Sequence, residues 1–123
     1  IDLFKPASFT YSATGQFLTD ARRHRKPVMI GESTPKFVGV GKGEASWNEW
    51  FRPYFALIEA HPHVKAFCYI NWNWAKYDYW KDWGDARIGQ HEYVRQAYQQ
   101  AISRPRIAHG TDQARTEALL NGR

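Results

Sequence analysis

The stretch Pro27-Val28-Met29-Ile30-Gly31-Glu32-Ser33-Thr34-Pro35 decides the fold. Its first half is apolar, which predicts a short strand over residues 28–31, and the Ser-Thr-Pro that follows marks a turn. The strand therefore leads directly into a carboxylate, Glu32. In α/β barrels the carboxyl-terminal rim of the sheet carries the chemistry. Glu32 is accordingly the first candidate for a catalytic residue.

A second strand ends in an aromatic segment. Residues 64–70, Val-Lys-Ala-Phe-Cys-Tyr-Ile, are almost continuously apolar, as expected of a parallel strand that is buried on both faces. They include Cys68, the only cysteine, which excludes an internal disulfide and is expected to be a small core residue. Asn71-Trp72-Asn73-Trp74 follows directly. An acid after one strand and tryptophans after the next suggest a site that cleaves sugars.

Strands and helices alternate along the chain. The expected elements are a strand end at 1–4, a helix at 16–24, the strand at 28–31, a helix at 46–61, the strand at 64–70 and a helix at 90–102. Ser46-Trp47-Asn48-Glu49 matches a capping box with Ser46 as the N-cap, and Pro53 is expected to kink that helix or to mark its first turn. The alternation predicts a parallel sheet with helical crossovers, either a doubly wound sheet or part of a barrel.

The length limits what the chain can form. A complete (β/α)8 barrel needs roughly 200 residues or more, and the chain has 123. The predicted fold is therefore α/β, the C-terminal portion of a (β/α)8 TIM barrel with about strands six to eight and their helices. Residues 1–103 would supply these units, and residues 104–123 a tail with a short helix at 112–120. Because the chain opens on the end of a strand, we expect a natural N-terminus upstream, which leaves localisation open, secretion included.

The net charge of +5 raises nucleic-acid binding as a possibility. Its densest run, residues 22–26, falls at a helix end, where cations suit the helix dipole. The loop tryptophans lie instead among Asp78, Asp82 and Asp85, so the basic residues do not interleave with aromatics as nucleic-acid binding requires. No apolar run is long enough for a membrane span. We therefore predict neither a nucleic acid nor a membrane as a partner.

Metal and phosphate sites are also unsupported by the sequence. His61 and His63 flank Pro62 without a third ligand nearby, which is typical of a turn rather than a zinc site. The stretch 33–44, with one proline and three glycines, indicates a mobile loop. Its glycine-rich part, residues 39–43, lacks the spacing of a phosphate-binding loop. We predict no cofactor and no metal.

Three segments together resemble a known enzyme group. They are residues 26–35, the run Trp47-x-x-Trp50-Phe51-x-Pro53-Tyr54-Phe55, and residues 61–72. Over about residues 1–103, the chain resembles the C-terminal part of clan A glycoside hydrolases, and most closely glycoside hydrolase family 26, the β-mannanase type. The resemblance is moderately specific, because several clan A families share a strand-seven acid and a strand-eight tryptophan.

The resemblance implies a role for each matching residue. Glu32 corresponds to the nucleophile at the end of strand seven. Trp72 corresponds to the aromatic floor under the sugar at the end of strand eight, and Trp74 is the close alternative. A retaining glycosidase also needs a second carboxyl group as acid/base. In clan A that glutamate ends strand four, a segment that this chain does not contain.

Each assignment has a structural alternative. Glu32 could instead be an acid that holds an arginine, and Trp72 and Trp74 could be core residues. Trp80 and Asp85 are further candidates for substrate binding, but the loop that contains them could fold on its own aromatics. Asp85 could then simply pair with Arg87 and fix the loop.

We therefore predict a fragment of a retaining glycoside hydrolase that cleaves a β-linked, mannan-like polysaccharide with Glu32 as nucleophile. Without the acid/base, this chain alone should be inactive. Its partners would be an oligo- or polysaccharide and the upstream half of the barrel, or other copies of itself through exposed strand edges. The alternative function is a non-catalytic carbohydrate-binding or remnant protein that uses Trp72, Trp74 and Trp80 to stack on sugars.

Overall fold

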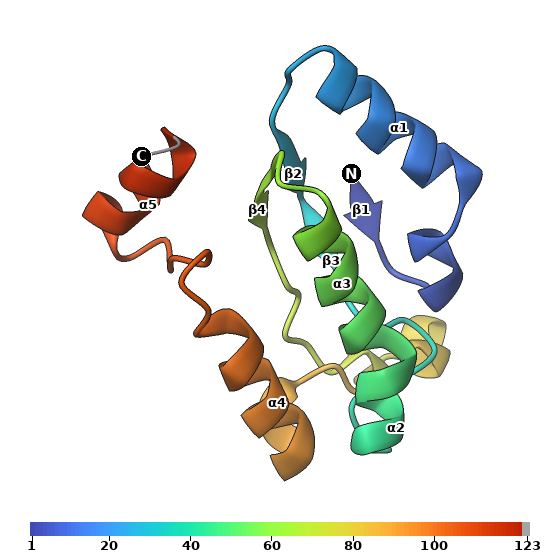
Figure 1. The fold of residues 1–123 in the computed structure, drawn as a ribbon. Helices are drawn as coiled ribbons and strands as arrows, with labels where there is room; N and C mark the ends of the chain where they lie inside the picture. Colours follow the sequence, from blue (N-terminus) through green and yellow to red (C-terminus); the bar gives the residue numbers. More distant parts are fainter. Residues whose placement is uncertain (122–123) are drawn as a thin grey trace.

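The computed structural model describes residues 1–121, in which parallel strands are covered by helices on one side (Figure 1). The strands are β1 (Asp2–Leu3), β2 (Val28–Ile30), β3 (Glu32–Ser33) and β4 (Val64–Phe67). The helices between and after them are η1 (Pro6–Phe9), α1 (Ser12–Arg23), α2 (Glu44–Ser46), η2 (Trp47–Phe51), α3 (Arg52–Ala60), α4 (Glu92–Ile102) and α5 (Gln113–Leu120). Three short 3₁₀ helices follow β4, namely η3 (Trp74–Lys76), η4 (Asp78–Trp83) and η5 (Ile88–Gln90).

The strands pair in parallel, as the alternation of elements predicts. β1 pairs with β3, with Asp2 opposite Glu32, and β2 pairs with β4, with Ile30 opposite Phe67. Only Gly31 separates β2 from β3, so residues 28–33 form one extended run with a neighbour on each side. Backbone hydrogen bonds of 2.9 Å from Gly31 N to Ile1 O and from Cys68 N to Ile30 O continue these ladders. The barrel to which the strands were assigned stays a prediction.

The core lies between the strands and the helices α1 and α3. Leu18 on α1 and Tyr54 on α3 are buried against strand residues such as Ile30. Trp50 is fully buried, and its indole Nε1 donates a 2.7 Å hydrogen bond to the Phe4 carbonyl oxygen. This bond satisfies the one polar group of a large apolar side chain, as buried tryptophans require. The core thus ties the helical layer to the segment after β1.

The helix expected from Ser46 begins earlier than predicted, and Ser46 is not its N-cap. The chain turns into α2 at Glu44, directly after Gly43, whose φ of 58° suits glycine. Ser46 is buried within the helix, and its hydroxyl accepts a 3.2 Å hydrogen bond from Lys42 N. The π-helical turn η2 follows, and Pro53 then lies in the first turn of α3, one of its two predicted positions.

One face of the strands is open, which corrects the expectation that residues 64–70 are buried on both faces. Cys68 is exposed rather than a core residue, and the Met29 side chain is 51% exposed. The regular strand β4 also ends at Phe67, although Ile70 N still donates to Ser33 O at 2.8 Å. The physical reason is that α1 and α3 pack on only one face, and no other described segment buries these two side chains on the opposite face.

The tail has the predicted helix, because α5 spans Gln113–Leu120 where 112–120 was expected. Arg106 connects the tail to the end of α3 through hydrogen bonds to the carbonyl oxygens of Glu59 and His61. Within residues 1–121, no helix combines the length and the apolar character that crossing a membrane would require.

Candidate active site

Glu32 is exposed because the strand is irregular at Gly31. Ile30 and Ser33 are both buried, although they are three positions apart. A regular strand alternates with period two, so burial of Ile30 would also place residue 32 in the core. The break between β2 and β3 shifts this alternation by one residue. As a result Ser33 points into the core and the Glu32 side chain is exposed.

Hydrogen bonds on both sides of Glu32 hold the irregular segment. The Asp2 carboxylate on β1 accepts a 3.2 Å hydrogen bond from the backbone N–H of Glu32. The buried Ser33 hydroxyl donates to the Cys68 carbonyl oxygen at 2.6 Å and shares a 2.9 Å hydrogen bond with the Tyr54 hydroxyl. Burial raises the pKa of Tyr54, so this hydroxyl stays neutral. The backbone that carries Glu32 is thus fixed from the neighbouring strands and from α3.

The carboxylate of Glu32 forms no ion pair with any residue from 1 to 121. The alternative in which Glu32 holds an arginine therefore has no support in the structure. An exposed carboxylate without an ion-pair partner, at the end of a parallel strand, has the position that a nucleophile needs. Its catalytic role itself stays a prediction.

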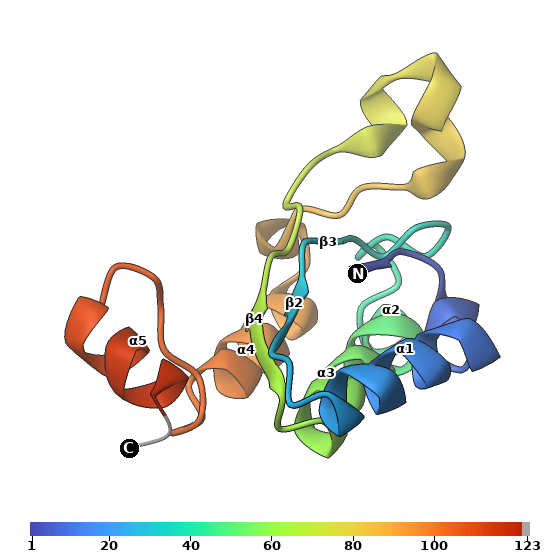
Figure 2. The same ribbon diagram turned by 90° about the horizontal axis from the view of Figure 1, so that it is seen from above.

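An aromatic segment projects from the end of β4. We call residues 72–83 the aromatic loop; in Figure 2 the yellow part of the chain extends away from the strands and helices. Its aromatic residues are Trp72, Trp74, Tyr77, Tyr79, Trp80 and Trp83. The Trp72 side chain is 50% exposed and lies nearly parallel to Tyr77, with ring centroids 6.4 Å apart. Trp80 is 37% exposed. These rings are available to a ligand.

Trp74 is the inner ring of the aromatic loop. It is half-buried, and its Nε1 donates a 3.0 Å hydrogen bond to the Thr34 hydroxyl. Its ring centroid lies 5.0 Å from that of Trp83 and 5.8 Å from that of Trp80. Thr34 follows Glu32 by two positions. The hydrogen bond therefore links the aromatic loop directly to the segment that carries the candidate nucleophile.

The base of the loop is closed by Asp85. An isolated antiparallel bridge joins it to Asn73, and its carboxylate pairs with Arg87 at 2.7 Å, as the structural alternative predicted. The Arg87 guanidinium holds the pKa of Asp85 below its usual range. A Cβ on Gly39 would come within 3.1 Å of the Asp85 carbonyl oxygen, and Gly39 has a φ of 62°. The glycine-rich stretch thus packs against this base.

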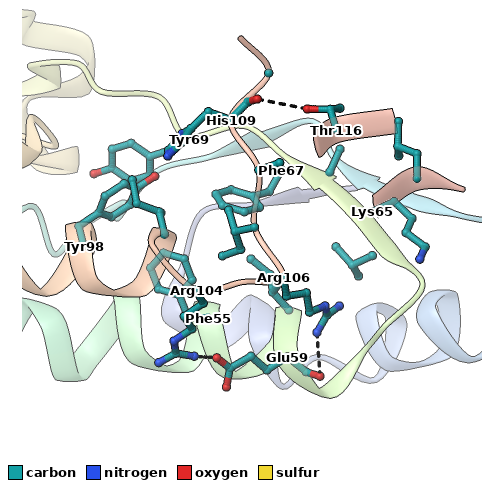
Figure 3. Close-up of a pocket in the computed structure, with 18 of the residues that line it drawn as sticks. Phe55, Glu59, Lys65, Phe67, Tyr69, Tyr98, Arg104, Arg106, His109 and Thr116 are labelled. Atoms are coloured by element: carbon teal, nitrogen blue, oxygen red, sulfur yellow. Dashed lines mark hydrogen bonds and ion pairs between the residues drawn. The ribbon is translucent and has the colours of Figure 1, made fainter. Parts of the chain in front are cut away.

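A cavity of about 610 Å³ lies elsewhere, between β4, α3, α4 and the tail (Figure 3). It is lined by aromatic side chains such as Phe67 and Tyr98. Arg104 forms an ion pair with Glu59 at its edge. None of the five predicted site residues lines this cavity. It is therefore separate from the candidate active site.

The histidine pair belongs to a turn. The ring of His63 forms a 2.9 Å hydrogen bond with the Leu18 carbonyl oxygen, and the His61 and His63 ring centroids are 5.6 Å apart. Burial and the neighbouring His63 lower the pKa of His61. Over residues 1–121, no group of three or more histidine, cysteine or acidic side chains is arranged to hold a metal ion.

Comparison with known proteins supports the glycoside hydrolase class. No protein-family model matches the chain. A beta-1,3-xylanase from Alcaligenes sp is 29% identical over 137 aligned residues, which cover 91% of this chain and 29% of the relative. Beta-1,3-xylanase TXYA from Vibrio sp is 27% identical over 137 residues, covering 92% of the chain and 30% of the relative. The chain spans less than a third of the length of these relatives. Neither relative is named a mannanase.

The structure adds residues that sequence reasoning missed. Thr34 holds Trp74, and its place two residues after Glu32 was the available signal. Lys36 and Phe37 lie beside the aromatic loop, with the Lys36 ammonium 3.9 Å from the ring centroid of Trp83. No sequence pattern pointed to this contact, because it joins segments that are almost fifty residues apart.

Proposed function

We propose that this chain is the C-terminal portion of a retaining glycoside hydrolase that cleaves a β-linked polysaccharide. The observation that carries the proposal is the exposed Glu32 carboxylate on a segment whose Thr34 is hydrogen-bonded to Trp74, in a loop of exposed aromatic rings. The resemblance seen in the sequence and the two xylanase relatives independently support the same class.

In this proposal Glu32 is the nucleophile. Its carboxylate attacks the anomeric carbon, the bond to the leaving sugar breaks, and a covalent glycosyl-enzyme forms. A second carboxyl group, about 5 Å from the first, gives its proton to the leaving oxygen and later takes a proton from the attacking water. We assign that acid/base to a part of the protein outside this chain. The reaction requires no metal or cofactor.

The aromatic loop would bind the polysaccharide. The face of a sugar ring packs on an aromatic ring while its hydroxyls remain hydrogen-bonded at the edge. Trp72 is the proposed platform, because it is half-exposed and braced by Tyr77. Trp74 would orient the loop through Thr34, and Trp80 would contact a neighbouring sugar unit. Asp85 would act by fixing the loop base through Arg87, rather than by touching the substrate.

We also propose that β1, the run formed by β2 and β3, and β4 are strands six, seven and eight of a (β/α)8 barrel. Their parallel pairing, the helices on one face and the small share of the relatives that the chain covers support this assignment. The upstream part of the barrel would cover the open face and pair with the free edges of β1 and β4.

The substrate is proposed to be β-1,3-xylan, the polysaccharide for which both relatives are named. The sequence resemblance instead favours a mannan-like polysaccharide. The assay should therefore contain both polymers. Turnover of only one of the two polymers identifies the substrate.

The decisive experiment compares Glu32→Gln with Glu49→Gln, a matched change at another exposed glutamate, in the longer protein that supplies the acid/base. Glu32→Gln should lower kcat by about a thousandfold or more, equivalent to roughly 4 kcal/mol of transition-state stabilisation, without lowering the melting temperature. Glu49→Gln should retain activity. Activity of Glu32→Gln within about tenfold of the wild type would overturn the nucleophile assignment.

The same assay separates the catalytic function from the alternative, non-catalytic one. That alternative rests on the exposed rings of Trp72 and Trp80 together with the missing acid/base. If the longer protein binds a polysaccharide and never hydrolyses it, the alternative is correct. We expect the 123-residue chain alone to bind without turnover.

A further inference from the structure

Two lysines and a phenylalanine gather beside the aromatic loop. Lys5 comes from the segment after β1, and Lys36 and Phe37 come from the segment after β3. The Lys36 ammonium lies 4.9 Å from the ring centroid of Phe37, and the Lys5 ammonium lies 5.4 Å from the same centroid. Both segments follow the carboxyl ends of parallel strands. The group therefore lies at the same end of the strands as Glu32.

The positive charges of this group have aromatic neighbours but no acidic partner among residues 1–121. Neither Lys5 nor Lys36 has a carboxylate within 4.0 Å in residues 1–121, whereas Arg87, Arg95 and Arg104 are each paired with an acid. Two like charges that share one ring repel each other, so an anion placed between them would be held favourably. Lysine suits such a role, because its ammonium is a compact charge with three N–H donors that can rotate toward an anion.

The backbone of Phe37 has a strained conformation. Its φ is 69°, in the left-handed region that a bulky side chain rarely adopts. Its ring is also 47% exposed, so burial of the side chain does not explain the strain. Strained backbone of this kind is concentrated at binding and catalytic sites. The two ammonium groups lie over this exposed ring. A sugar ring that stacks on Phe37 would displace them toward its own edge, where they can pair with a negatively charged substituent.

The group is connected to the candidate active site. The Lys36 ammonium also lies 3.9 Å from the ring centroid of Trp83. Trp83 packs on Trp74, with ring centroids 5.0 Å apart, and Trp74 is hydrogen-bonded to Thr34. A continuous set of contacts thus runs from Lys36 to Thr34, two positions after Glu32.

We propose that Lys5, Lys36 and Phe37 form a subsite for an acidic sugar unit of the polysaccharide. The Phe37 ring lies under the sugar, and the two ammonium groups pair with its anionic substituent. That substituent is either the carboxylate of a uronic acid or a sulfate ester, which present the same charged oxygens. The inference rests on the proposed function and specifies its substrate further: a β-linked polysaccharide that carries acidic sugar units among its neutral ones.

The test measures binding of the 123-residue chain to three xylo-oligosaccharides of equal length by isothermal titration calorimetry at low salt. One is neutral, one bears a single glucuronic acid, and one bears a single sulfate ester. At least one acidic ligand should bind about tenfold or more tightly than the neutral one, and this preference should fall as salt is added. The better of the two acidic ligands identifies the anionic group.

Three variants locate the preference. The double variant Lys5→Ala/Lys36→Ala should bind the acidic ligand only as well as the neutral one. Lys26→Ala/Lys65→Ala, which removes two exposed lysines elsewhere, should keep the preference and controls for net charge. Phe37→Asn removes the ring and tolerates a positive φ, so it should weaken neutral and acidic ligands together without lowering the melting temperature.

The outcomes separate the two proposals. Binding of the neutral ligand with no preference for either acidic one overturns the subsite and leaves the proposed function standing. A preference that survives in the double lysine variant also overturns the subsite. Failure of the folded chain to bind any of the three ligands overturns the subsite, whereas the proposed function is decided separately by Glu32→Gln in the longer protein.

Discussion

The molecule contains two aromatic regions that use the same residue types for opposite purposes. Trp50 lies under the strands, fully buried, stacked on Tyr54 with ring centroids 4.7 Å apart. Trp72 lies in the aromatic loop, stacked on Tyr77 and half-exposed. Trp50 fills space between layers, whereas Trp72 has space left for a partner. Exposure, rather than residue type, therefore separates the aromatics that stabilise the fold from those that can bind sugar.

The largest expected effect follows from changing Trp50, the buried tryptophan. Trp50→Ala should lower the free energy of unfolding by about 3–5 kcal/mol, because it leaves a large cavity in the core. It also removes the shorter of the two hydrogen bonds to the Phe4 carbonyl oxygen, which keeps only the one from Lys36 N. Denaturant unfolding followed by circular dichroism measures this loss. Trp50→Phe should lose less, because it retains part of the ring volume. If Trp50→Ala lowers the free energy of unfolding by less than about 1 kcal/mol, Trp50 does not stabilise the fold more than the exposed aromatics do.

The sequence predicts the buried region better than the exposed one. The helical spacing of Trp50 and Tyr54 and the apolar run before Glu32 follow from local periodicity, and both are where they were expected. Ser46 was wrongly expected to be the N-cap, because the helix begins at Glu44, directly after Gly43 and two residues before Ser46. Cys68 was wrongly expected in the core, because an apolar run does not reveal that only one face of its strand is covered.

The candidate site could be predicted only in part for the same reason. Glu32 was found because its signal is local, namely an apolar run followed by an acid and a turn. The contacts that position the loop are long-range: Trp74 binds Thr34, and Lys36 reaches Trp83. They depend on how parallel strands bring distant segments together. No window of sequence contains both partners.

The second largest expected effect concerns Trp72, the exposed tryptophan. Trp72→Ala should weaken binding of a neutral oligosaccharide by about tenfold, equivalent to roughly 1.4 kcal/mol, because one stacking face is lost. Its melting temperature should change little, in contrast to Trp50→Ala. Titration calorimetry and thermal melting on the same samples give both quantities. Tyr11→Ala removes an equally exposed aromatic outside the aromatic loop and serves as the matched control, which should keep its affinity. Loss of stability without loss of affinity would place Trp72 in the core and transfer the platform role to Trp74.

The smallest effect should come from the ion pair at the loop base, and it depends on pH. Arg87 lowers the pKa of Asp85 in the folded protein. A depressed carboxyl pKa stabilises the fold above the unfolded pKa of about 3.9, and this contribution is lost as the pH falls through the folded pKa. Asp85→Asn should therefore lower the melting temperature slightly at pH 7. The difference from the wild type should shrink below about pH 4 and vanish in stronger acid.

The location of this effect tests whether the loop folds as a separate unit. The Asp85 backbone joins Asn73 on one side and the N–H of Val40 on the other. Loss of the carboxylate that fixes this residue through Arg87 should therefore loosen the aromatic loop before the core. Hydrogen exchange should then accelerate at residues 72–86 and stay unchanged in α3. Glu92→Gln breaks a comparable exposed pair with Arg95 on α4 and should leave the loop unchanged. If hydrogen exchange in Asp85→Asn accelerates equally at residues 72–86 and in α3, the aromatic loop and the core open together. The two regions would then differ only in the exposure of their aromatic side chains.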